Sequence, residues 1–218
     1  MKIAFITTYD RKGGAAQSSW RTALALRKAG VEVKVVVQQA AAEENFVVPT
    51  NAGWKKMRSF TNEYLDRLTY IRHAPERSLW FRFSIGEIGQ DISQLKAIQE
   101  ADVLHLHWIN KGYLSIKSLE QLAALGKPII WSLHDMWSFT GGCHYAGDCD
   151  HFERTCGNCW YLKSPQENDL SHRMWQRKKL LYDQVRWTMV ASSAWLANVA
   201  KRSSLLKAQD IMNIPTPV

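Results

Sequence analysis

The sequence predicts an α/β fold, a doubly wound, mostly parallel sheet with helices on its faces. The chain has 218 residues, of which 46% are hydrophobic, which is enough to bury one large core. Residues 1–8 are apolar and β-branched, a pattern typical of a strand buried on both faces. A glycine-bearing loop, a helical pattern and a second apolar run complete the first 37 residues. This succession predicts a right-handed βαβ unit, and its repetition along the chain predicts a Rossmann-like sheet.

Each later element has its own signal. Apolar residues at helical spacing precede Gly30 and Gly126, so each glycine is expected to end a helix. Asp169 or Ser171 is the expected N-cap of a helix that follows a long loop. The remaining expected elements are helices at 18–29, 54–72, 92–100, 114–125, 169–185 and 194–203, strands at 31–37, 103–108, 128–133, 188–192 and 211–214, a loop at 38–53, and irregular chain with a short strand at 73–90.

The loop after the first strand contains Lys12, Gly13 and Gly14. Glycines there let the backbone approach a ligand, and the helix N-terminus that follows offers unpaired N–H groups to a phosphate. The loop lacks the spacing of dinucleotide-binding and ATP-binding loops, so NAD binding and simple ATP hydrolysis are disfavoured. A tight turn that requires positive φ is the alternative interpretation.

Three histidines lie in or just after expected strands. His105 and His107 share one face of a strand, where they act as metal ligands or, as we favour, as hydrogen-bonded polar groups. His134 ends another strand and is followed by Asp135, at the edge where open α/β sheets bind ligands. We therefore expect His134 on the same sheet edge as the glycine loop. An imidazole there can serve as a base or as a hydrogen-bond donor to a sugar or phosphate, a capping or packing role being the alternative.

Four cysteines lie within residues 140–162, which we term the cysteine loop: Cys143, Cys149, Cys156 and Cys159. Five, six and two residues separate them in turn, so the set ends in a C-x-x-C motif. This spacing fits a closed four-thiolate structural zinc site, in which His144 or His151 could replace one thiolate. Free or partly oxidised thiols are the alternative, and two disulfides are disfavoured in a reducing compartment. The zinc interpretation predicts that the four sulfurs converge on one point, and no catalytic metal is expected.

The net charge of +8 favours anionic partners. Because no sustained basic run exists, specific nucleic-acid binding is not expected. No apolar run reaches the roughly 18 residues of a membrane span, and the N-terminal run is too short for a signal peptide, so a cytoplasmic protein is expected. A basic surface could hold it at the inner membrane face, a solvated helix face being the alternative. The residues of that expected surface are Lys55, Lys56, Arg58, Arg177, Lys178 and Lys179.

Four segments carry a resemblance to a known family. They are KIAFITTYDRKGGAAQSSWRTALALRKAGVEVKVVV, ADVLHLHWINKGYLSIKSL, KPIIWSLHDMWSFTGGCHYAGDCDHFERTCGNCWYL and VASSAWLANVAKRSS. Together they resemble the N-terminal half of family-4 glycosyltransferases of the GT-B type, and among these the bacterial enzymes that build surface polysaccharides, including the colanic-acid type. The most specific segment is HDMWSFTGGCHY, whereas residues 40–100 carry no recognisable resemblance.

The resemblance implies that residues 1–218 are the acceptor-side domain of a two-domain enzyme whose C-terminal, donor-binding domain is absent from this chain. It implies that Gly13 and Gly14 contact the donor phosphates, that Asp135 belongs to the same substrate site, and that His134 reaches the transferred sugar. The implied reaction moves a sugar from a nucleotide-sugar donor to a growing surface polysaccharide or lipid-linked acceptor, and this chain alone is expected to be inactive. The alternatives are a nucleotide-sugar epimerase of the same fold and a non-catalytic, zinc-stabilised interaction domain.

Overall fold

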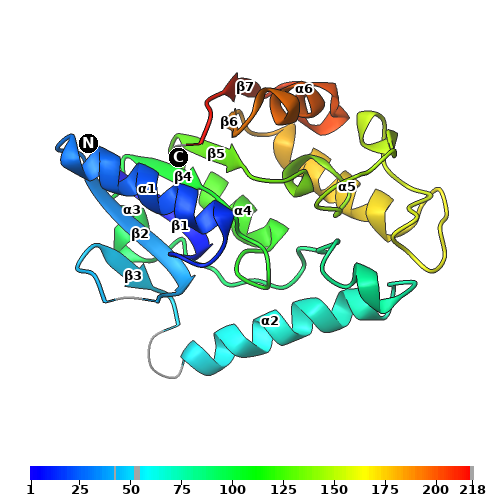
Figure 1. Cartoon of the computed structure of the whole chain (residues 1–218), viewed down its shortest axis with the longest axis horizontal. Coiled ribbons are helices and arrows are strands. Elements are labelled where there is room, and N and C mark those ends of the chain that lie inside the picture. The colour runs from blue at the N-terminus through cyan, green and yellow to red at the C-terminus, as the bar shows by residue number, and fades with distance from the viewer. Residues whose placement is uncertain (42, 52–54, 217–218) are drawn as a thin grey trace.

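The computed structural model describes residues 1–41, 43–51 and 55–216. Within them, parallel strands form one sheet in the order β3-β2-β1-β4-β5-β6-β7 (Figure 1). The predicted Rossmann-like α/β fold is therefore confirmed. The strands are β1 (Lys2–Tyr9), β2 (Glu32–Gln39), β3 (Val47–Pro49), β4 (Val103–Leu106), β5 (Ile129–Leu133), β6 (Thr188–Ala191) and β7 (Asp210–Asn213).

Helices cover the sheet, and a long helix, α2, runs along one side of the molecule (Figure 1). Side-chain capping fixes several starts: Ser115 and Ser118 form a capping box, and Asp169 accepts hydrogen bonds from the amides of Ser171 and His172, as predicted for the N-cap. The helices are α1 (Gly14–Lys28), α2 (Lys55–Ile71), α3 (Lys96–Gln99), α4 (Ile116–Ala123), α5 (Leu170–Tyr182) and α6 (Ala194–Arg202), with short 3₁₀ turns at Arg77–Leu79, Trp137–Phe139, His151–Glu153 and Ser204–Leu206.

Alternation along the central strands divides the core between the two faces of the sheet. Phe5 and Val35 pack with Trp20 of α1 in the smaller cluster of buried residues. Their neighbours Ile6 and Val36 belong to the larger cluster. This two-sided burial explains why β1 is apolar at nearly every position rather than at every second one.

Two elements differ from the sequence-based expectation. β3 lies within the segment predicted to be loop; it has three residues, ends in Pro49 and pairs only with β2, so its periodic signal is too short to recognise. The helix predicted at 92–100 is reduced to Lys96–Gln99, because the carboxylate of Asp91 accepts the Ser93 amide and holds a turn ahead of it. The short strand expected in the irregular segment 73–90 is reduced to an isolated antiparallel bridge between Phe83 and Cys143.

The strand order places a ligand-binding edge between β1 and β4. From β1 the chain passes through α1 to β2 on one side, whereas β4, β5, β6 and β7 extend the sheet on the other side. In open α/β sheets a crevice forms at the carboxyl ends of the strands where the order reverses in this way. Here that crevice receives the glycine loop after β1 and the chain that follows β4.

The predicted basic surface is wrong at Lys178. This residue lies on α5 and is 1% exposed, with its ammonium 3.7 Å from the centroid of the Trp137 ring and hydrogen-bonded to the carbonyls of Trp137 and Thr140. Its position on the buried helix face, three and four residues from Leu181 and Met174, explains the burial. Burial lowers the pKa of Lys178 to about 7.

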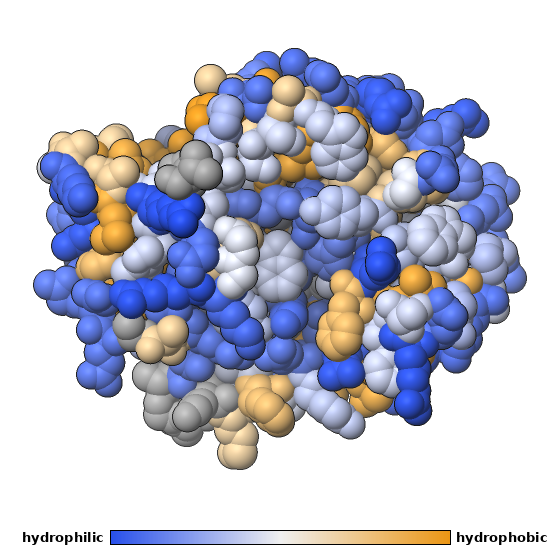
Figure 2. All heavy atoms as spheres, viewed as in Figure 1, coloured by the Kyte–Doolittle hydropathy of each residue, from blue (hydrophilic) through white to orange (hydrophobic). Residues whose placement is uncertain are grey.

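The other members of that predicted surface divide into two groups. Arg177 pairs with Glu87, and Lys179 pairs with Asp183, so each has an acidic neighbour. The side chains of the other three members lie outside the described residues: Lys55, Lys56 and Arg58. On the face shown in Figure 2, hydrophilic residues dominate and hydrophobic ones are scattered. Among the described helices, none is both long and apolar enough to cross a membrane.

Candidate functional site

A cavity of about 750 Å³, which we term the carboxyl-edge cavity, opens where the strands end. Gly13, Gly14, His134 and Asp135 all line it. The prediction that the glycine loop and His134 share one sheet edge is therefore confirmed. Ser192 lines the same cavity from the end of β6.

The glycine loop leaves the start of α1 open toward this cavity. Gly13 has φ +92°, a conformation that favours glycine, and no side chain caps the helix that begins at Gly14. A Cβ placed on either glycine would meet no atom within 4 Å. No acidic residue occupies the first turn, so its partial positive charge is not offset there. The uncapped N–H groups, with Lys12 and Arg21 on the cavity wall, make a site suited to an anionic group.

His134 contacts a second histidine, His107. Its Nε2 lies 3.1 Å from Nδ1 of His107, and the two rings stack with centroids 5.4 Å apart. His107 also lies 4.4 Å, centroid to centroid, from His105, whose Nε2 bonds to the Ser132 hydroxyl at 2.9 Å. The expected hydrogen-bonded role is therefore observed for His105, whereas His107 keeps one buried nitrogen, Nε2, without a partner.

Burial keeps these three rings neutral at neutral pH. It lowers the pKa of His105 and of His134 to about 4 each, and it lowers the pKa of His107 well below the ordinary 6.5. For His134 the neighbouring Asp135 acts in the opposite direction but does not outweigh burial. A neutral imidazole carries one N–H and one lone pair, so His134 can bind a ligand by either but adds no positive charge to the cavity.

Asp135 is engaged by the protein itself. One carboxylate oxygen, Oδ2, accepts the indole N–H of Trp108 at 2.9 Å and lies 2.7 Å from Nδ1 of His144. The other oxygen, Oδ1, accepts the Trp137 amide at 2.9 Å. Burial alone would raise the pKa of Asp135, but His144 and these hydrogen bonds outweigh it, so the pKa falls below the ordinary 3.8. Asp135 is thus an anionic residue that positions Trp108 and His144.

His144 extends this network into a second, smaller space. Its Nε2 lies 2.9 Å from the hydroxyl of Ser84, so Asp135, His144 and Ser84 form one hydrogen-bonded chain. Reciprocal backbone hydrogen bonds, from Ser84 to Gly142 and from His144 to Arg82, fix the two segments side by side. From the sequence, His144 is expected only as a possible replacement for one cysteine ligand of zinc, and Ser84 has no expected role. The segment HDMWSFTGGCHY, which contains both Asp135 and His144, is the signal that points to His144.

The second space, which we term the α2 cavity, has a volume of about 260 Å³. Trp108 and Lys111 line both cavities, so the two share a wall. Burial raises the pKa of Asp66, which lines the α2 cavity, to about 6. The aromatic residues of its lining are Phe60, Tyr64, Tyr70, Trp80, Phe81, Phe83 and Trp108. Aromatic faces next to carboxyl and hydroxyl groups are the chemistry that binds sugar rings.

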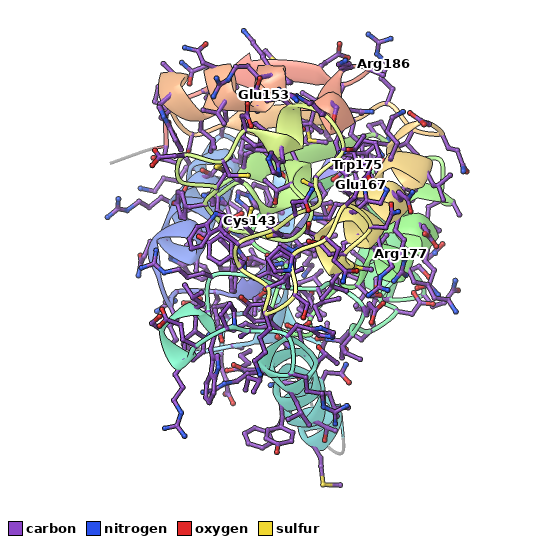
Figure 3. The ribbon with its side chains drawn as sticks, turned by 90° about the vertical axis from the view of Figure 1, so that its right-hand side faces the viewer. Cys143, Glu153, Glu167, Trp175, Arg177 and Arg186 are labelled. Carbon is purple, nitrogen blue, oxygen red and sulfur yellow. The ribbon has the colours of Figure 1, made fainter. Side chains whose placement is uncertain are left out.

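The cysteine loop packs against the core beside this site, with Cys143 labelled in Figure 3. All four cysteines are free thiols, and Cys159 is buried. Among the described residues, no three His, Cys, Asp or Glu side chains form a group that could hold a metal ion. Burial raises the pKa of Cys143 to about 11 and that of Cys159 to about 12, as expected for thiols packed in a core.

The three histidines His105, His107 and His134 predict a loss of stability in acid. Because the folded-state pKa values of His105, His107 and His134 lie below 6.5, the unfolded chain binds more protons between about pH 4 and 6.5. Asp66, whose folded pKa is raised to about 6, offsets one of these protons. We expect the free energy of unfolding in urea to fall by about 1 to 3 kcal/mol per pH unit between pH 6.5 and 5. A flat profile would contradict this, and Asp66→Asn should steepen it.

Comparison with known proteins supplies the family. The model of glycosyltransferase family 4 matches residues 12–218. The chain is also 25% identical over 159 residues to a protein of Escherichia coli (strain K12) described as "Putative colanic acid biosynthesis glycosyl transferase WcaC". That match covers 67% of this chain and 39% of the relative, so the chain spans well under half of the relative's length. With the family model covering nearly the whole chain and the sheet in place, the chain belongs to glycosyltransferase family 4.

Proposed function

We propose that this chain is the acceptor-side, N-terminal part of an enzyme that transfers a sugar from a nucleotide-sugar donor to a growing surface polysaccharide or a lipid-linked acceptor. The observation that carries the proposal is the carboxyl-edge cavity, lined by both the open helix start at Gly13–Gly14 and the neutral His134. The family match and the name of the relative support the reaction class.

Different residues of this cavity would contact the two parts of the donor, its diphosphate and its sugar. As the bond between the sugar and the diphosphate breaks, negative charge accumulates on the leaving diphosphate. The free amides at the start of α1, with Lys12 and Arg21 beside them, would receive that charge. His134, which lines the same cavity from the end of β5, would bond to a hydroxyl of the transferred sugar and so hold its anomeric carbon in place for the reaction.

The α2 cavity would take the acceptor. It shares Trp108 and Lys111 with the carboxyl-edge cavity, so a sugar ring in it would lie next to the donor. The hydrogen-bonded chain of Asp135, His144 and Ser84 crosses this shared wall and would fix the wall's shape.

A second domain outside this chain would hold the nucleotide, and we propose that this chain alone is inactive. We also propose that the protein is cytoplasmic and that it attaches to an anionic membrane surface. We further propose that the cysteine loop binds a structural zinc ion; metal analysis of the reduced protein tests this.

Filling the open space at Gly14 should weaken donor binding without unfolding the protein. Gly14→Val places a branched side chain where no atom lies within 4 Å of the Cβ, at a helix start that tolerates it. In the full-length enzyme we expect the donor KM to rise about tenfold or more, and the free energy of unfolding to change by less than about 1 kcal/mol.

The matched control is Ala25→Val, which adds the same side chain at an exposed position of α1 away from the cavity. It should leave the donor KM unchanged. Initial rates at varied donor concentration, with urea unfolding of the same variants, make the comparison. A donor KM that is unchanged in Gly14→Val would remove the glycine loop from the donor site.

A further inference from the structure

His107 is a buried residue whose only side-chain hydrogen bond among the described residues is with His134. It is 3% exposed, it stacks on Phe5 with centroids 5.1 Å apart, and its Nδ1 lies 3.1 Å from Nε2 of His134. Its other nitrogen, Nε2, is buried without a hydrogen-bond partner. By contrast, the second nitrogen of His134, Nδ1, has no partner among the described residues but belongs to a side chain that lines the carboxyl-edge cavity.

The unpaired nitrogen of His107 decides which ring donates. Both rings are neutral, so each carries a single N–H. If His134 donated from Nε2, the proton of His107 would sit on its buried Nε2, where nothing accepts it. If His107 donates from Nδ1, its Nε2 carries only a lone pair. The remaining N–H then lies on Nδ1 of His134, whose side chain lines the cavity. Orphaned buried N–H groups are the rarer defect in proteins, so the second arrangement is favoured.

We propose that His107 is a positioning residue: by donating its Nδ1–H to Nε2 of His134, it fixes His134 as the tautomer that carries its proton on Nδ1 and presents an N–H donor to the carboxyl-edge cavity. His134 then binds an oxygen lone pair, from a sugar hydroxyl or a phosphate, and does not act as a base. This assignment of ligand chemistry rests on the proposed function, whereas the tautomer itself does not.

The tautomer is measured on this chain directly. Two-bond ¹H–¹⁵N correlation spectra of the uniformly labelled chain at pH 7.5 distinguish protonated from unprotonated ring nitrogens, and His134→Ala identifies the His134 signals. We expect a protonated Nδ1 and an unprotonated Nε2 for His134. A proton on Nε2 of His134 in the wild type would overturn the proposal.

Two variants of His107 test its role. His107→Phe keeps a ring against Phe5 but cannot donate, so His134 should lose the fixed Nδ1–H form and populate the other tautomer. His107→Asn retains an amide donor near the place of Nδ1 and should preserve the wild-type pattern, which keeps the test valid if the phenylalanine variant folds poorly. His105→Phe, the matched control on the same strand, should also preserve it. An unchanged His134 in a folded His107→Phe would overturn the role of His107.

Kinetics of the full-length enzyme separate this inference from the proposed function. His107→Phe should lower kcat about tenfold with little change in nucleotide diphosphate binding, and His107→Asn should restore most of it. A normal kcat in a His107→Phe enzyme that has lost the Nδ1 proton would overturn the use of that proton in transfer. If the wild-type spectra show the expected tautomer but the full-length enzyme transfers no sugar, the proposed function fails and the tautomer assignment stands.

Discussion

In the full-length enzyme, His134→Ala is expected to lower kcat by about 10²-fold while changing the dissociation constant of the nucleotide diphosphate by less than about threefold. The reason is the division of contacts in the carboxyl-edge cavity. His134 lines it on the side of β5, whereas the amides that suit a phosphate come from the start of α1. Losing His134 therefore removes the hydrogen bond that positions the transferred sugar but leaves the phosphate-binding amides intact.

The matched control for this prediction is His73→Ala, which removes an exposed imidazole from the turn after α2 and should leave kcat unchanged. Steady-state kinetics at saturating donor, with calorimetric binding of the nucleotide diphosphate, provide both numbers. If His134→Ala kept a near-normal kcat, His134 would be a structural residue of the sheet edge.

Asp135→Ala is expected to lower the free energy of unfolding by about 3 to 5 kcal/mol. The change leaves the Trp137 amide, the Trp108 indole N–H and Nδ1 of His144 without their acceptor. Each buried polar group left unpaired costs about 1 to 3 kcal/mol, and the three costs overlap because the groups share one carboxylate.

Urea unfolding compares this variant with Asp148→Ala, a change at an exposed aspartate of the cysteine loop that should stay within about 0.5 kcal/mol of the wild type. Asp135→Asn should fall between the two, because its amide keeps one oxygen but places N–H groups where donors already point. A loss below about 1 kcal/mol in Asp135→Ala would show that the network does not hold the two cavities together.

The fold was predictable because its signals are local. Apolar runs bounded by glycines, such as the one before Gly30, and caps such as Asp169 lie within a few residues of the elements they define. β3 could not be predicted because a three-residue edge strand is too short to show a periodic pattern of apolar residues. The burial of Lys178 was within reach: in α5, positions three and four residues apart face the core, and Lys178 shares that face with Met174. The basic run 177–179 therefore lies only partly on the surface, because its middle residue, Lys178, is buried.

The candidate site was predictable only in part, because some of its contacts depend on packing. His134 and Gly13 follow strands, so the edge they share is a consequence of parallel topology. The contact between Ser84 and His144 joins residues 60 positions apart through an isolated bridge, which no local pattern indicates. Asp135 lines the expected site, but its carboxylate also bonds to Trp108, Trp137 and His144. Trp108 and His144 come from other segments of the chain, so tertiary contacts and not a local pattern decide these two bonds.

The central claim, that this chain contributes the sugar-binding edge of a glycosyltransferase, is tested most directly by product analysis. The full-length enzyme is incubated with a panel of nucleotide sugars and a lipid-linked acceptor, and mass spectrometry follows every product. We expect the acceptor to gain the mass of one sugar residue and an equal amount of nucleotide diphosphate to be released. Gly14→Val and His134→Ala should reduce both. An epimerised nucleotide sugar with an unmodified acceptor, or no product from folded wild-type enzyme, would contradict the central claim.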